Sequence, residues 1–175
     1  MTINELAFDS TFFRTAMGRF ATGVTVITGE AGFPGQARRA VGLTVNSFNA
    51  VSLSPPLVLW SLSRSASTHD AFMACERYVI QVLSAEQRAL ALRFASGTQA
   101  ERFTDAPLAR APGGGLMLDV PSVSWFECTP YDRHMAGDHT IMVSRVRHCG
   151  YAEGSPLIFH AGSFELTPMP ALVDG

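Results

Sequence analysis

Small hydroxyl and amide side chains are concentrated in residues 42–56, where they alternate with apolar residues. In an extended chain, successive side chains point to opposite faces. Thr44 and Asn46 therefore lie on one face, while Val45 and Ser47 lie on the other. One face can pack against the protein while the other meets a ligand. We expect this strand to form the wall of a site for a polar ring system.

A cation and a predicted helix start follow the next apolar strand, residues 57–62. Ser67 and Thr68 are good N-cap residues, and Asp70 stands three positions after Ser67. An open helix N-terminus offers unpaired N–H groups and a partial positive charge, and Arg64 adds side-chain donors nearby. Such a place suits a phosphate group. The alternative is that Ser67 only caps the helix and that Arg64 is a solvated surface charge.

The composition excludes several classes of function. The chain has 175 residues and a formal net charge of −2, without the excess of basic residues typical of a nucleic-acid-binding protein. All 13 basic residues are arginine, so a lysine Schiff base with pyridoxal phosphate cannot form. The three cysteines, Cys75, Cys128 and Cys149, are widely spaced and odd in number. They predict neither a disulfide framework nor a metal site.

The sequence has no feature of a targeted or membrane-spanning chain. No basic region followed by an apolar stretch opens it, and no apolar run approaches the roughly 20 residues of a membrane span. We therefore expect a cytoplasmic protein that binds neither a membrane nor a nucleic acid. One domain is expected over residues 1–175, with a core at about 11–166 and a loose tail at 167–175.

Two patterns predict helices besides the one after Thr68. Apolar residues at helical spacing predict a helix over 11–21, capped by Asp9 or Ser10. Ser84 and Gln87 form a capping box for a further helix that runs through Phe94.

The rest of the chain is predicted to be mainly β. Strands are expected over residues 24–29, 40–51, 57–62, 78–83, 123–131, 140–149, 157–159 and 164–166. Residues 96–121 are rich in Gly, Pro and Ala and predict a long loop. The absence of βαβ alternation favours an antiparallel barrel. The glycines at 113–115 lie in that loop, without the strand-to-helix context of a dinucleotide-binding motif.

Four segments resemble one family in its own order. They are Phe13-Arg-Thr-Ala-Met-Gly-Arg-Phe-Ala-Thr-Gly-Val-Thr-Val-Ile-Thr28, residues 42–59, Gly137-Asp-His-Thr-Ile141 and Pro156-Leu-Ile-Phe-His160. Together they cover most of residues 12–165 and resemble the short-chain flavin reductases, which supply reduced flavin to two-component monooxygenases. The resemblance implies a homodimeric, antiparallel split β-barrel, mainly β with peripheral helices. It also implies that the protein binds FMN or FAD and reduces it with NADH or NADPH.

Because the sequence has no G-x-G-x-x-G site for the nicotinamide cofactor, we expect NADH or NADPH to stack on bound flavin in an open cleft. Hydride transfer then needs the nicotinamide C4 about 3 to 3.5 Å from flavin N5. Backbone N–H groups of Val45 to Ser47 are our candidates to stabilise negative charge near flavin N1. His139 is the implied catalytic residue, beside the flavin face, where its imidazole would donate to the nicotinamide carboxamide or ribose. The alternative for His139 is a structural hydrogen bond within a strand.

The implied flavin-binding residues lie along most of the chain. They are Thr44, Val45, Asn46, Ser47, Ser52, Ser61, Leu62, Arg64, Ser67, Thr68, Gln81, Phe94, Arg102 and His139. Gln81 stands where the family commonly has asparagine, so its partner can differ. Arg102 is equally well explained as a surface arginine. His160 is followed by Ala161 where the family often has a basic or aromatic residue, which leaves its role open.

Two other functions stay open on the sequence alone. One is a flavin carrier or sensor without nicotinamide turnover. The other is a split-barrel enzyme that keeps its FMN and reduces a different substrate directly. Consumption of NADH or NADPH with and without free flavin distinguishes them from a reductase that serves a separate oxygenase.

Overall fold

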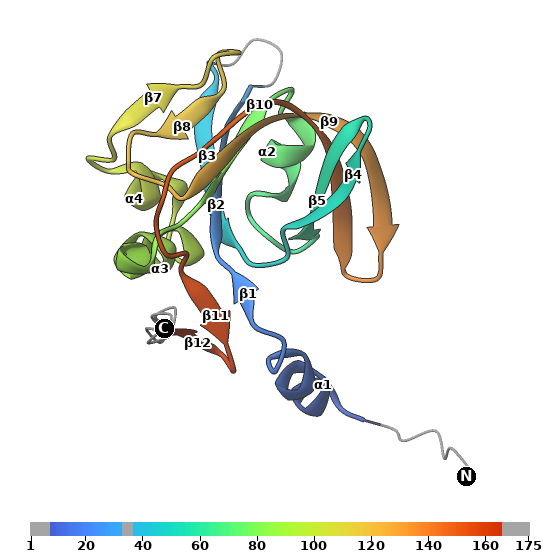
Figure 1. Cartoon of the computed structure of the whole chain (residues 1–175). Helices are drawn as coiled ribbons and strands as arrows, with labels where there is room; N and C mark the ends of the chain where they lie inside the picture. Colours follow the sequence, from blue (N-terminus) through green and yellow to red (C-terminus); the bar gives the residue numbers. More distant parts are fainter. Residues whose placement is uncertain (1–7, 33–36, 166–175) are drawn as a thin grey trace.

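The computed structural model describes residues 8–32 and 37–165, and a seven-stranded antiparallel sheet forms its centre (Figure 1). The strand order is β3-β2-β6-β9-β10-β5-β4. The bounds are Thr25–Ala31 for β2, Arg39–Val45 for β3, Asn49–Leu53 for β4, Pro56–Ser63 for β5, Tyr78–Val82 for β6, Ser124–Ala136 for β9 and His139–Tyr151 for β10. Although β3 and β4 are consecutive in the chain, they form the two edges of the sheet, which is therefore split between them.

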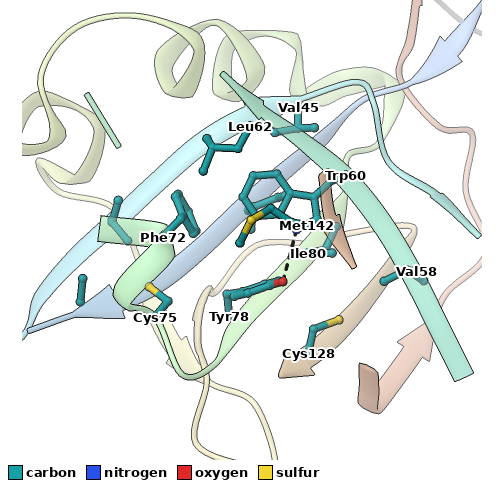
Figure 2. Packing of buried hydrophobic residues seen from close by; sticks show 13 residues of the cluster. Val45, Val58, Trp60, Leu62, Phe72, Cys75, Tyr78, Ile80, Cys128 and Met142 are labelled. Atoms are coloured by element: carbon teal, nitrogen blue, oxygen red, sulfur yellow. Dashed lines mark hydrogen bonds between the residues drawn. The ribbon is translucent and has the colours of Figure 1, made fainter. Parts of the chain in front are cut away.

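The sheet curls around a hydrophobic core. Val45 on β3 and Val58 on β5 come from opposite ends of the strand order, yet they belong to one buried cluster. Helix α2 (His69–Ala74) inserts the fully buried Phe72 into this cluster. Its ring meets Trp60 and Tyr78 edge to face, with centroids 5.3 and 6.2 Å apart (Figure 2). The predicted mainly β, antiparallel split barrel is confirmed.

Smaller elements flank the barrel. Strands β1 (Thr22–Gly23), β11 (Ile158–His160) and β12 (Ser163–Glu165) form a three-stranded sheet, and β7 (Leu108–Arg110) pairs with β8 (Leu116–Leu118). Helices α3 (Arg88–Ala95) and α4 (Gln99–Phe103) contact β3, and a 3-10 turn spans Ala85–Gln87. Helix α1 (Ser10–Met17) extends away from the barrel, and none of its residues is buried (Figure 1). Within the described ranges, no helix is long and apolar enough to cross a membrane.

The predicted strand over 40–51 is wrong in one respect, because the structure divides it into β3 and β4. Residues 46–48 leave the ladder between the two strands. Ser47 makes this turn, and its hydroxyl accepts a hydrogen bond from the backbone N–H of Ser61 at 2.9 Å. The run of alternating polar and apolar residues therefore begins in strand β3 and ends in a turn.

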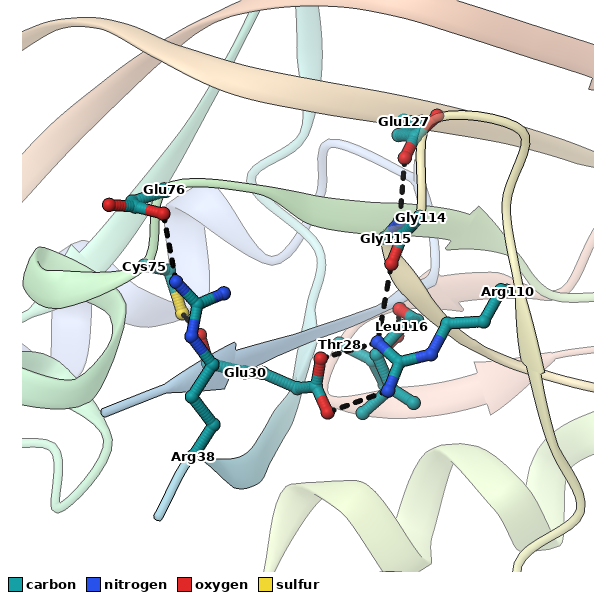
Figure 3. A network of polar contacts seen from close by, with 10 residues as sticks. All are labelled: Thr28, Glu30, Arg38, Cys75, Glu76, Arg110, Gly114, Gly115, Leu116 and Glu127. Atoms are coloured by element: carbon teal, nitrogen blue, oxygen red, sulfur yellow. Dashed lines mark hydrogen bonds and ion pairs between the residues drawn. The ribbon is translucent and has the colours of Figure 1, made fainter. Parts of the chain in front are cut away.

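Residues 96–121 are also more regular than the predicted loop, since they contain α4 and the β7–β8 hairpin. A capping box of Thr98 and Glu101 starts α4. The hairpin is held by tertiary polar contacts, including one from Thr28 Oγ1 to the Leu116 carbonyl at 2.8 Å and one from Gly115 N to Glu127 at 2.7 Å (Figure 3). Composition alone could not reveal these partners.

The predicted helix ends need small corrections. Asp9 caps α1, as one of the two alternatives predicted, and accepts a hydrogen bond from the Phe12 N–H at 2.7 Å. The helix ends at Met17, four residues earlier than predicted, because the chain turns at Gly18. At α2 the N-cap is Thr68, and its side chain makes no capping hydrogen bond. The predicted tail at 167–175 lies outside the described residues.

Candidate functional site

The main cleft opens where the sheet is split and is covered on one side by α1. It has a volume of about 390 Å³ and is lined by Arg14, Met17, Gly18, Phe20, Thr22, Asn46, Ser47, Phe48, Asn49 and Phe159. An adjoining pocket of about 250 Å³ is lined by Val24, Thr44, Asn46, Phe159 and Phe164. Because the two share Asn46 and Phe159, we treat them together as the α1 cleft. Cavities that hold small organic ligands typically fall in this size range.

The end of β3 presents amide and hydroxyl groups to the α1 cleft. Thr44 and Asn46 line it from the same face of the strand, as their spacing predicts. Val45, between them, is buried in the core, and its carbonyl accepts a hydrogen bond from Thr25 Oγ1 at 2.9 Å. Thr44 Oγ1 is itself held by the Ala91 carbonyl at 2.6 Å. These bonds fix the strand from both sides and leave Asn46 as its free polar side chain at the cleft.

Ser47 joins the split edge of the sheet to β5. Its Oγ is the acceptor for Ser61 N, so both predicted site residues lie at the same corner. Ser52, by contrast, lies on the edge strand β4 opposite Leu57 and does not line the α1 cleft. The sequence pattern thus predicts the cleft residues at the end of β3 correctly, whereas the predicted residue on β4 does not line the cleft.

A second hollow, which we call the Arg64 hollow, lies at the end of β5. It has a volume of about 570 Å³ and is lined by Arg64, Ser65, His69 and Asp138. Arg64 lies against the β9–β10 turn: its backbone N–H donates to the Asp138 carbonyl at 2.9 Å, and its Nη1 reaches the Gly137 carbonyl at 3.5 Å. The guanidinium remains exposed to solvent. Of the other two predicted phosphate ligands, Ser67 is exposed, whereas Thr68 is buried.

His139 starts β10 directly after this turn. It lies opposite Ser63 on β5, so it shares the end of the barrel with Arg64. Its Nδ1 lies 2.7 Å from Oδ1 of Asp138, and this hydrogen bond lowers the pKa of the Asp138 carboxyl. A carboxylate can only accept, so the neutral imidazole carries its proton on Nδ1. In this neutral form Nε2 is an acceptor, so the predicted donation to the nicotinamide requires the doubly protonated imidazole. The role of His139 stays a prediction.

Four of the predicted flavin-binding residues, Gln81, Phe94, Leu62 and Arg102, are buried and line neither hollow. Gln81 is fully buried and exchanges two hydrogen bonds with the backbone of Leu118, at 2.9 and 3.0 Å. Phe94 and Leu62 are also fully buried. None of these three side chains lines the α1 cleft or the Arg64 hollow. They support the walls of the site, and a direct contact with a cofactor stays a prediction.

Arg102 is the fourth of these residues. Its Nη1 donates to the Gly42 carbonyl at 2.7 Å and its Nε to the Ser96 carbonyl at 3.0 Å, which ties α4 to β3. Burial lowers the pKa of its guanidinium. The alternative of a surface arginine is wrong, because the residue is only 8% exposed.

The sequence reasoning missed the contribution of α1 and β1 to the site. Arg14, Met17 and Phe20 line the α1 cleft, and Thr22 lies beside them on β1. The signal was present in the apolar residues at helical spacing over 11–21, which predicted the helix but were not assigned to the site. The large side chains among them are exposed: Phe12 by 66%, Met17 by 55% and Phe20 by 69%. Among the described residues, no group of three or more His, Cys, Asp or Glu could hold a metal ion.

The sequence of the chain is similar to those of known proteins of one family. The model of the flavin reductase like domain matches residues 17–167. FMN reductase (NADH) SmoA from Agrobacterium fabrum is 40% identical over 156 residues, which cover 89% of this chain and 85% of that protein. The family match and this identity extend over nearly the whole described fold.

Two solved structures are similar in fold and sequence. One is the NADH:FAD oxidoreductase SgcE6 of Streptomyces globisporus C-1027 in complex with NAD and FAD fragments, with a TM-score of 0.82 and 30% identity over 96% of this chain and 100% of that one. The other is the styrene monooxygenase flavin reductase of Pseudomonas putida S12, with a TM-score of 0.77 and 30% identity over 91% of this chain and 99% of that one. This chain therefore belongs to the flavin reductase-like family.

Proposed function

We propose that this protein is an NADH-dependent flavin reductase, which transfers a hydride from NADH to FMN or FAD and releases reduced flavin to a separate monooxygenase. The observation that carries the proposal is the α1 cleft, where aromatic side chains meet the amide of Asn46 and the hydroxyl of Ser47 at the split of the barrel. The proteins with which the chain shares its family include NADH-dependent FMN and FAD reductases by name.

The residues present suit a flavin. Phe48 and Phe159 offer apolar surface to a flat ring, and Asn46 and Ser47 offer hydrogen bonds to its polar edge. Arg64, in the Arg64 hollow, is exposed, and its planar guanidinium fits the oxygen atoms of a phosphate. A bound flavin supplies the acceptor for two electrons and a proton as hydride.

The protein's own residues bind and orient the two reactants. The α1 cleft has a volume of about 390 Å³, and we propose that the nicotinamide stacks there on the bound flavin ring. His139, held by Asp138, presents Nε2 as an acceptor for a carboxamide N–H or a ribose hydroxyl. Positioning of the reacting atoms is the main contribution that hydride transfer needs.

A second copy of the chain is the proposed cover for the outer face of α1. Phe12 and Phe13 are 66% and 52% exposed, and Phe13 stacks on Phe8 at 5.5 Å, which makes a continuous aromatic surface. Exposed patches of this kind mark interaction sites. In a homodimer the covered helix would hold its inner face, with Arg14 and Met17, against the cleft.

Light scattering tests the homodimer. We expect the wild type at twice the chain mass and the double variant Phe12→Ser, Phe13→Ser at the chain mass. Leu92→Ser, at an exposed apolar position on α3, is the matched control and should stay dimeric. A monomeric wild type would contradict the homodimer without touching the reductase activity.

NADH oxidation with and without added flavin tests the reductase. We expect NADH consumption to need free FMN or FAD and to rise with flavin concentration up to saturation. Under anaerobic stopped flow, bound flavin should bleach when NADH is added. Oxidised flavin after saturating NADH and NADPH would favour a carrier or sensor. Turnover without free flavin, only with an added organic acceptor, would favour an enzyme that keeps its FMN.

A further inference from the structure

Thr22 is a hydroxyl residue on the wall of the α1 cleft with an unmet hydrogen-bonding requirement. It lies on β1, directly opposite Phe159 on β11. Residues paired across antiparallel strands share one face of the sheet, and accordingly both line the cleft. The Oγ1 atom of Thr22 is closed off from solvent and has no hydrogen-bond partner in the part of the chain that the structure describes.

Such an arrangement is costly for the protein without a ligand. A buried hydroxyl without a partner loses its hydrogen bonds to water and gains nothing in return. Other threonines on neighbouring strands avoid this cost. Thr25, Thr28 and Thr44 each donate to a backbone carbonyl, at 2.9, 2.8 and 2.6 Å. Thr44 also lines the α1 cleft, but its hydroxyl is satisfied by the protein, whereas that of Thr22 is not. We therefore expect the partner of Thr22 to come from a ligand.

The surroundings of Thr22 define the chemistry of that partner. Phe159 lies beside it and Phe20 is close by on the same wall, so the space favours a flat aromatic ring. Asn46 faces the cleft from the end of β3 and offers a second polar group. A ring held between these groups needs a polar edge with both carbonyl and N–H character. The nicotinamide carboxamide and the pyrimidine edge of flavin both have it.

We propose that Thr22 is a ligand-binding residue, whose hydroxyl bonds the amide-like edge of the ring that occupies the α1 cleft. The proposal requires a rotation about χ1 that turns Oγ1 toward the cleft, where a threonine hydroxyl can donate to a carbonyl or accept from an N–H. The inference rests on the proposed function only for the identity of the ring. The requirement of the hydroxyl for a partner is a property of the structure by itself.

Two substitutions at this position test the proposal. Thr22→Val keeps the branched shape and removes the hydroxyl, whereas Thr22→Ser keeps the hydroxyl and removes the methyl group. We expect Thr22→Val to weaken the ligand by roughly 2- to 12-fold, the loss of one hydrogen bond, and Thr22→Ser to restore most of it. The ligand-free Thr22→Val protein should unfold at the same or a higher temperature, because an unpaired buried hydroxyl has been removed.

The two readouts separate the two possible ring sources. FMN affinity is measured by fluorescence titration without NADH, and the KM for NADH is measured at saturating FMN. A weaker FMN affinity in Thr22→Val assigns the hydroxyl to flavin. An unchanged FMN affinity with a raised KM assigns it to the nicotinamide. Either result supports the proposal if Thr22→Ser behaves like the wild type. Thr22→Ala replaces Thr22→Val in both assays if the valine variant does not fold.

Three results would overturn the proposal. The first is unchanged FMN affinity and KM in Thr22→Val. The second is an equal loss in Thr22→Val and Thr22→Ser, which would assign the effect to shape. The third is a lower unfolding temperature of ligand-free Thr22→Val, which would mean that the hydroxyl already has a partner in the protein. A wild type that binds FMN but does not oxidise NADH would contradict the proposed function alone, since the FMN titration would still test Thr22.

Discussion

Nδ1 of His139 lies 2.7 Å from Oδ1 of Asp138, its neighbour in the β9–β10 turn. Because the carboxylate can only accept, this contact selects the tautomer with the proton on Nδ1 and leaves Nε2 facing outward as an acceptor. A residue next to it in the chain therefore sets the chemistry of the outer nitrogen. The pair is exposed, with side-chain accessibilities of 43% for His139 and 93% for Asp138.

The first prediction concerns this histidine. If Nε2 positions the nicotinamide, His139→Ala should slow flavin reduction or raise the KM for NADH by up to about 100-fold, because small misplacement of reacting atoms is costly. Flavin affinity should change much less. Stopped-flow reduction rates and flavin titration on the same folded variant give the two quantities.

Asp138→Asn is the matched control for His139. An asparagine side chain can donate as well as accept, so the tautomer is no longer fixed. We expect a smaller kinetic effect than that of His139→Ala. Unaltered reduction kinetics in His139→Ala would assign the residue to structure, and parallel loss of flavin and activity would assign it to the flavin site.

The second prediction concerns the phosphate of FMN. Arg64→Ala should weaken FMN binding by about 1.5 kcal/mol, the lower end for a hydrogen bond to a charged group, because the guanidinium is exposed to solvent. Riboflavin, which lacks the phosphate, should bind almost as before. Arg88→Ala, an exposed arginine at the start of α3, serves as the charge-matched control. Equal losses for FMN and riboflavin would show that Arg64 acts on the ring or on folding.

The third prediction separates a structural glutamine from a cofactor ligand. Gln81→Leu removes both hydrogen-bond partners of the Leu118 backbone inside the core. Each buried group left unpaired costs about 1 to 3 kcal/mol, so the free energy of unfolding should fall by more than 2 kcal/mol. Urea denaturation measures the loss. Gln99→Leu, which removes a single side-chain acceptor from the Gly42 N–H, should cost less.

Flavin affinity decides the role of Gln81. We expect the folded Gln81→Leu protein to bind flavin with nearly the wild-type affinity, since this side chain lies away from the cleft. A large loss of flavin affinity with little loss of stability would show that Gln81 contacts the flavin.

The fourth prediction uses the buried carboxylate of Glu127. Burial acts to raise the pKa of Glu127, but the hydrogen bonds from the Gly115 and Gly113 N–H groups oppose it. A hydrogen bond from His148 at 2.7 Å and the charge of Arg77 act in the same direction, and the net pKa is lowered. Added Cβ atoms at Gly113 and Gly115 would come within 2.7 and 2.8 Å of this carboxylate, which explains why the loop carries glycine there.

A lowered pKa in the folded state fixes the sign of the pH dependence. The stabilisation from Glu127 is fully present above its unfolded pKa of about 4.3 and is lost as the pH falls through the lower folded value. Glu127→Gln should therefore be less stable than the wild type at pH 7, by about 1.5 to 3 kcal/mol for the lost charge-assisted bonds, and the difference should shrink toward pH 3. Urea midpoints at both pH values give the comparison. A difference that stays constant with pH would mean that the carboxylate is not charged in the folded protein.

Local pattern determined much of this protein. The opposite facing of Thr44 and Val45 on β3, the Asp9 cap of α1 and the capping box of Ser84 and Gln87 depend on neighbours within a few residues, and the structure has all three. The absence of βαβ alternation predicted an antiparallel barrel, and the pairs of the seven-stranded sheet are all antiparallel. The polar strand end at Asn46 and Ser47 also lies at the cleft, as its side chains predicted.

The tertiary structure decided which distant elements lie against each other and which side chains meet there. Thr22 and Phe159 lie far apart in the chain, and only the pairing of β1 with β11 brings them to one wall. Gln81 carries an amide suited to a ligand, yet the approach of β8 gives that amide to Leu118 instead. Periodicity reports which face of an element is polar, but not which distant element will cover that face. This is the physical reason why the cleft, its α1 wall and its unpaired hydroxyl became visible only in the folded chain.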